Sequence, residues 1–149
     1  TRVKGTIAHE PAGPPFENTV LGTGKRRAWG PTDIKRTYAP PVNDPSEIAV
    51  VRDEKPDAPN AFVCWMQKAP ARQLVNLKGI PAVVIAAEAS YHRNYDHCTV
   101  KYLNQAGMKV EWMPLDAKGI HGNGHMLMIG KHNLALAKVI DAGEKQNVK

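Results

Sequence analysis

The sequence predicts an α/β fold whose regular part lies toward the C-terminus. Residues 80–87 form one continuous apolar run of strand length, which is typical of a strand buried on both faces of a parallel sheet. Helical spacing over residues 97–106, a strand pattern over 109–114 and helical spacing over 126–142 follow in order. This strand, helix, strand, helix alternation is typical of α/β proteins. A length of 149 residues fits one domain of ordinary size.

The first half of the chain is less regular. Residues 3–9 are rich in strand formers, and Glu10-Pro11 ends this predicted strand. Residues 12–59 hold most of the prolines, which interrupt any long element. A loop-rich segment of this length is unusual unless it is functional, so we expect it to cover something. Residues 61–77 are expected to carry one or two short helices.

Composition and charge exclude several classes of protein. No apolar run approaches the roughly 18 residues of a membrane helix, which excludes an integral membrane protein. The net charge is +6, but the basic residues are scattered, and the cluster Lys25-Arg26-Arg27 lies in a Gly-rich loop without aromatic neighbours. Nucleic-acid binding is therefore not favoured. The chain starts at Thr1 without a Met or an apolar leader, so we expect a processed piece without a signal peptide.

The two cysteines, Cys64 and Cys98, are too few for a disulfide scaffold and do not form a C-x-x-C pair. A thiolate zinc site is therefore not predicted. Two free buried thiols are the favoured interpretation, although a single disulfide remains an alternative. Two cysteines are compatible with an oxidising compartment and with a reducing one.

Polar side chains follow each predicted strand. Glu10 follows the first strand, Glu88 follows the apolar run, and His121 and His125 lie in the Gly-rich loop after the third. Ligands of open α/β sheets bind at the carboxyl ends of the strands. A carboxylate that accepts the N–H of a histidine fixes its tautomer, so these residue types predict an acid-oriented general base.

Two other interpretations of this loop stay open. The glycines could simply shape a turn before a helix, with His125 as an N-terminal residue of that helix. His121 and His125, four residues apart, could ligate a metal, but the intervening Gly-x-Gly argues against a helix and a third ligand would be needed. We therefore predict no metal site.

A nucleophile is missing. The only serines are Ser46, in the Pro-rich segment, and Ser90, two residues beyond Glu88. Neither stands in the G-x-S-x-G elbow of serine hydrolases. The chain thus holds a base and an acid without the group that they would activate.

Residues 121–128 read H-G-N-G-H-M-L-M. They resemble the H-G-N-S-H-M-M-M signature of a group of bacterial serine esterases with the α/β-hydrolase fold. The likeness continues through residues 79–85 and 133–134, and residues 3–11 resemble the strand that follows the nucleophile helix. Together these segments cover about half of the chain.

The resemblance implies the C-terminal portion of an α/β-hydrolase sheet, with three parallel strands, flanking helices and a loop-rich lid. Residues 1–15 would form a strand and the acid-bearing turn, residues 16–78 the lid, and residues 79–149 the last strand-helix-strand-helix of the core. The strands and the serine elbow that precede this portion are absent from the chain. We therefore expect a partner chain that completes the sheet and supplies the nucleophilic serine and the oxyanion hole.

The resemblance also implies roles for single residues. His125 matches the catalytic histidine, and Glu10 matches the acid of this esterase group. Glu88 is the second candidate, at the position where most α/β-hydrolases keep their acid. Three side chains are expected to contact substrate: Phe16, Trp29 and Met126.

The implied activity is hydrolysis of a carboxylic ester or lactone, without a cofactor and without a nucleic-acid or membrane partner. One alternative is a non-catalytic binding module with residues 11–59 as its interaction surface. Another is an autoproteolytically processed hydrolase that uses Thr1 as nucleophile. The compartment stays open, with secretion or the periplasm favoured, and the sequence does not identify the substrate.

Overall fold

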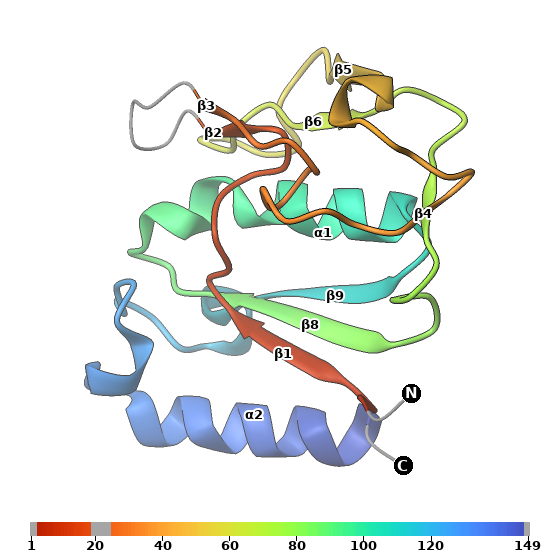
Figure 1. The fold of residues 1–149 in the computed structure, drawn as a ribbon. Helices are drawn as coiled ribbons and strands as arrows, with labels where there is room; N and C mark the ends of the chain where they lie inside the picture. Colours follow the sequence, from red (N-terminus) through yellow and green to blue (C-terminus); the bar gives the residue numbers. More distant parts are fainter. Residues whose placement is uncertain (1–2, 19–24, 148–149) are drawn as a thin grey trace.

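A three-stranded parallel sheet forms the centre of the molecule. The computed structural model describes residues 3–18 and 25–147. The sheet has the order β1 (Thr6–His9), β8 (Pro81–Ala86), β9 (Lys109–Pro114), so the strand from the middle of the sequence lies between the other two (Figure 1). The predicted mixed α/β class and the three parallel strands are confirmed.

Helices cover both faces of this sheet. Helix α1 (Asp96–Gln105) connects β8 to β9 and lies on one face, and α2 (Asn133–Asn147) lies on the other (Figure 1). Short 3-10 helices complete the helical elements of the described residues: Pro45–Glu47, Tyr91–Asn94, Leu115–Lys118 and Leu127–Ile129. Across residues 3–18 and 25–147, no helix combines the length and the apolar character needed to span a bilayer.

The packing of β8 explains its apolar run. Successive side chains of a strand point to opposite faces of the sheet. Val83 and Ile85 join the hydrophobic cluster that includes Leu136 of α2. Val84 packs instead with Val100 of α1. Both faces of β8 are therefore buried, and polar residues are excluded from it.

Helix α1 ends where the sequence predicts. Gly107 has a φ of 89°, a left-handed conformation that favours glycine. The Met108 N–H donates to Leu103 O at 3.0 Å across this turn. Such a bond satisfies a carbonyl of the last helical turn, which is how a glycine stops a helix.

Residues 16–78 form three short antiparallel strand pairs. The expected helices within residues 61–77 are wrong, because this segment pairs in extended conformation with earlier parts of the chain. The pairs are β2 (Glu17–Asn18) with β3 (Lys25–Arg26), β4 (Tyr38–Ala39) with β7 (Gln73–Leu74), and β5 (Val50–Arg52) with β6 (Trp65–Gln67). We call residues 16–78 the excursion; Figure 1 shows most of it beyond α1, on the side away from the sheet.

Aromatic residues bind the excursion to α1. Phe16 is 1% exposed and meets the Tyr102 ring of α1 edge to face, with the centroids 5.4 Å apart. Trp29 is 6% exposed and stacks on Tyr38. The structure thus buries Phe16 and Trp29, which were expected to contact substrate, inside a hydrophobic cluster, because the excursion needs a core of its own against α1. Gly30, with a φ of 90°, lies directly against Tyr102.

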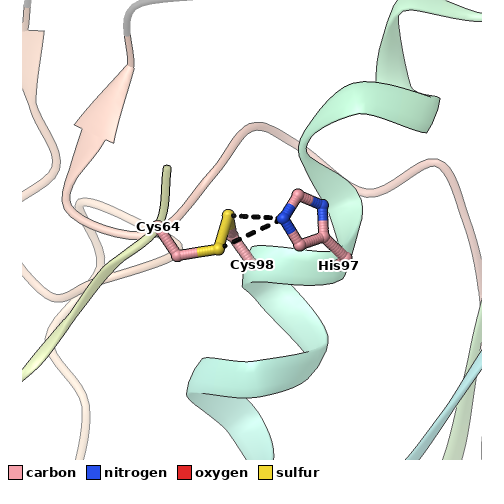
Figure 2. Close-up of side chains that lie close together, drawn as sticks. All are labelled: Cys64, His97 and Cys98. Carbon is pink, nitrogen blue, oxygen red and sulfur yellow. Dashed lines mark hydrogen bonds between the residues drawn. A yellow bond between two sulfur atoms is a disulfide. The ribbon is translucent and has the colours of Figure 1, made fainter. Parts of the chain in front are cut away.

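A disulfide also joins the excursion to α1. Cys64, just before β6, is bonded to Cys98 of α1, and the two Cα atoms are 5.2 Å apart. The expectation of two free thiols is therefore wrong, since packing brings together cysteines that the sequence separates by 34 residues. Nε2 of His97 lies 3.3 Å from the Cys64 sulfur and 3.5 Å from the Cys98 sulfur (Figure 2).

Candidate active site

Glu10 follows β1 in an unusual backbone conformation. Its φ is 47°, which is uncommon for a residue other than glycine. The Glu10 N–H donates to Ile85 O at 3.0 Å, so pairing with β8 continues one residue beyond the strand. The side chain is only 1% exposed. Local strain of this kind persists where surrounding contacts hold it, and it clusters at functional sites.

Three donors surround the Glu10 carboxylate. Oε1 accepts a hydrogen bond from the Ala87 N–H at 2.9 Å. Oε2 accepts one from the Ser90 hydroxyl at 2.9 Å and lies 2.5 Å from Nδ1 of His125. A buried carboxylate with this many donors is fixed in position and retains its acceptor role.

His125 lies in the loop between β9 and α2, and its side chain is 43% exposed. Helix α2 begins only at Asn133, so His125 is not an N-terminal residue of that helix. Gly122, with a φ of 74°, gives the loop its sharp turn. Because Nδ1 donates to Glu10, the neutral ring presents Nε2 as an acceptor, which is the tautomer that a general base requires.

Glu88 and His121 form a separate, exposed pair. Nδ1 of His121 lies 3.2 Å from both carboxylate oxygens of Glu88, and the Gly122 N–H donates to Oε2 at 2.9 Å. The Gly122 N–H, followed by His121, holds the pKa of Glu88 below its ordinary value. His121 and His125 therefore turn to different carboxylates, and Glu10 is the acid in contact with His125.

Sequence reasoning missed a second histidine and acid pair at this site. Nδ1 of His92 lies 3.2 Å from both oxygens of Asp96, and the two residues are 3% and 0% exposed. His92 is buried against the His125 ring, and the side chain of His97 is 13% exposed beside the disulfide. The i, i+4 spacing of His92 and Asp96 was the available signal.

The His92 ring stacks on the His125 ring. The centroids are 4.7 Å apart and the planes differ by 5°. Burial lowers the pKa of His92 and raises the pKa of Asp96 to about 8, with the nearby charge of Glu10 adding to the shift of Asp96. Both shifts disfavour the charged forms.

Neither serine is placed as a nucleophile for His125. The Ser90 hydroxyl donates to Glu10, and the Ser46 hydroxyl donates to Asp44 at 2.6 Å. Thr1 lies outside the described residues. Met126, beside His125 in the chain, is 54% exposed and available to a ligand.

Three groups in the described part of the chain bring together side chains that could ligate a metal. In the first, His97 with the two cysteines, the sulfurs are bonded to each other. In the second, Glu10, His92 and His125, both Glu10 oxygens already accept hydrogen bonds. In the third, Asp53 and Asp57 with Cys64, Lys101 neutralises the acids at 2.6 and 2.9 Å. None offers a free ligand set.

Known proteins similar to this chain include a lipase. A probable secreted lipase, phiG, of Fungal sp. (strain ATCC 74256) is 42% identical over 139 residues, which are 93% of this chain and 38% of that protein. This chain is similar to part of a lipase. It spans less than two fifths of the relative's length.

One solved structure and the family models complete the comparison. A novel bacterial esterase, solved at atomic resolution, is 31% identical over 49% of this chain and 25% of its own, with a TM-score of 0.43. No protein-family model matches the chain. The closer kinship with the H-G-N-S-H-M-M-M esterases stays a prediction.

Proposed function

We propose that this chain is the C-terminal part of a serine hydrolase for carboxylic esters or lactones. His125 acts as the general base, Glu10 orients it, and the serine nucleophile and the oxyanion hole belong to a partner chain. The observation that carries the proposal is the contact of 2.5 Å between Nδ1 of the exposed His125 and the buried Glu10 carboxylate.

The reaction follows from this geometry. Nε2 of His125 accepts the hydroxyl proton as the partner's serine oxygen attacks the ester carbonyl. Glu10 stabilises the imidazolium and keeps its ring in place, while Ala87 and Ser90 hold Glu10. The imidazolium then gives the proton to the departing alkoxide, and an acyl-enzyme forms. Water, activated by the same nitrogen, releases the acid and restores the serine.

Two features of this chain support the proposed partner chain. Within the described residues, no strand pairs with the outer edge of β1, and parallel sheets rarely leave such an edge open. Nδ2 of Asn123 is buried, and none of the described residues offers it a hydrogen-bond partner. An unsatisfied buried amide costs about 1–3 kcal/mol, so an acceptor from outside the chain would stabilise it.

The excursion would serve as the lid in this proposal. Its Phe62 N–H donates to Asn94 O at 2.7 Å, and the Phe62 ring lies 6.1 Å from Tyr95, which in turn lies against His92. The excursion thus reaches the border of the site. Met126 would contact the substrate, whereas buried Phe16 and Trp29 would support the lid from inside.

We further propose that the protein is secreted or periplasmic. Disulfides persist in oxidising compartments, and Cys64 and Cys98 form one. The relative phiG is described as secreted.

The test is fluorophosphonate labelling of the native protein, followed by denaturing mass spectrometry of every polypeptide present. We expect the label on a serine of a second chain, and no label when His125 is replaced with Ala. His132→Ala, at an exposed histidine before α2, is the matched control and should label normally. No label at all would refute the hydrolase and favour the binding module, and a label on Thr1 would identify the autoproteolytic nucleophile.

A further inference from the structure

His92 and Asp96 have no part in the reaction described above, although they are buried against it. Both lie near the N-terminus of α1, and both oxygens of the Asp96 carboxylate lie 3.2 Å from Nδ1 of His92. Burying a carboxyl group completely costs folding free energy, and apolar residues of similar size would often be at least as stable. A buried pair of this kind therefore calls for a specific role.

The hydrogen bond to Glu10 alone does not fix the His125 ring. Rotation about the line from Nδ1 to Oε2 leaves that bond intact but swings Nε2 away from its position. The terminal torsion of a histidine is broad, so the side chain itself offers little resistance. A flat surface against one face of the ring removes this freedom, and the nearly parallel His92 ring at 4.7 Å is such a surface.

The His92 ring can serve His125 only if it stays uncharged during turnover. His125 becomes an imidazolium, and a second imidazolium stacked on it would oppose that step. His92 faces Asp96 on α1, Glu10 after β1, the His125 ring, and the Tyr91 and Tyr95 rings at 4.5 and 4.8 Å. Burial lowers the pKa of His92 and raises that of Asp96, so it favours the uncharged form of each.

A hydrogen-bond chain also couples the two histidines. The Ser90 hydroxyl donates to Glu10, and Ser90 Oγ accepts the His92 N–H at 3.2 Å. The backbone of His92 is therefore tied to the same carboxylate that holds His125.

We propose that His92, held by Asp96, is a positioning residue that fixes the ring plane of His125 and so directs Nε2 at the nucleophile. This inference rests on the proposed function. It assigns to His92 a supporting role through its flat neutral face, with no proton transfer of its own.

The test compares three replacements of His92 in the complete protein with its partner chain. His92→Phe keeps a flat neutral ring, and we expect kcat within about threefold of the wild type and an unchanged pH profile. His92→Ala and His92→Leu remove the flat face, and we expect kcat to fall about 10- to 100-fold with little change in KM, as for a misplaced catalytic group. Leu fills the volume, so a folding defect of the Ala variant does not end the test.

The hydrogen-bonded Nδ1 proton of His125 provides a second readout by NMR. We expect its downfield resonance in the wild type and in His92→Phe, and its broadening or loss in His92→Leu. A wild-type kcat in His92→Leu would overturn the inference, and so would a Phe variant as impaired as the Leu variant, which would place His92 in the proton transfer. An unlabelled, inactive wild type would refute the proposed function instead, and the resonance would still decide whether His92 orders the ring.

Discussion

Replacing Glu10 with Gln tests the proposed acid without removing its volume. The fixed Ala87 N–H requires an oxygen opposite it, so the amide oxygen of Gln stays there. The amide NH2 group then faces Ser90 and His125. The Ser90 hydroxyl can rotate to accept, but His125 must present an unprotonated Nδ1. Its proton moves to Nε2, and the ring can no longer take a proton from the nucleophile.

The expected loss is large because the wrong tautomer removes the base. Amide replacement of the orienting acid in a triad lowers kcat by about 10⁴-fold, which corresponds to about 5 kcal/mol of transition-state stabilisation. The free energy of unfolding should fall far less, by about 1–2 kcal/mol, since all three hydrogen bonds can be remade with the neutral amide and only their charge assistance is lost.

The assay is kcat and KM on a chromogenic ester, with urea unfolding of each variant measured in parallel. Glu88→Gln is the matched control: its partners are His121 and Gly122, and we expect kcat within about threefold of the wild type. A Glu10→Gln variant within tenfold of wild-type kcat would refute the assignment of the acid. An equal loss in the Glu88 variant would refute the choice between the two carboxylates.

Three other perturbations test the scaffold by urea unfolding. Cys98→Ala opens the loop of 34 residues and should lower the free energy of unfolding by about 4 kcal/mol relative to the wild type. If the variant stays less stable than the wild type by the same amount when both are reduced, the disulfide is not the cause. Gly30→Ala would place a Cβ 2.9 Å from the Tyr102 hydroxyl at a φ of +90° and should cost about 2–3 kcal/mol, whereas no loss would refute the packing. Arg93 holds the pKa of Asp116 below its ordinary 3.8. The loss of stability in Asp116→Asn should therefore be complete above pH 3.8 and should shrink as the pH falls through the lowered pKa of Asp116. A loss of stability that does not change with pH would exclude the ion pair.

The sequence predicted the elements whose pattern is set by local burial. The apolar run of residues 80–87 became β8 because both faces of that strand are covered, and Gly107 ends α1 because only glycine adopts its conformation without strain. The strand pattern of residues 109–114 matches β9 residue for residue. In each case the determining interaction is encoded within a few neighbouring residues.

Features set by contacts between distant segments were missed. The strands within residues 61–77 form only because β4 and β5 pair with them, and no local pattern contains that information. The Cys64–Cys98 bond depends in the same way on how the excursion packs against α1. The sequence around His92 is polar and gives no sign of a buried residue, whereas its spatial neighbours are the His125 ring and Asp96.

The contact between Glu10 and His125 joins residues that are 115 positions apart, and β8 lies between the strands that precede them. Contacts of such long sequence separation are slow to form because the chain between them must be ordered first. A partly folded chain therefore carries both groups without the assembled pair. Catalytic competence would then appear only when the whole sheet has closed, so activity would itself report that folding is complete.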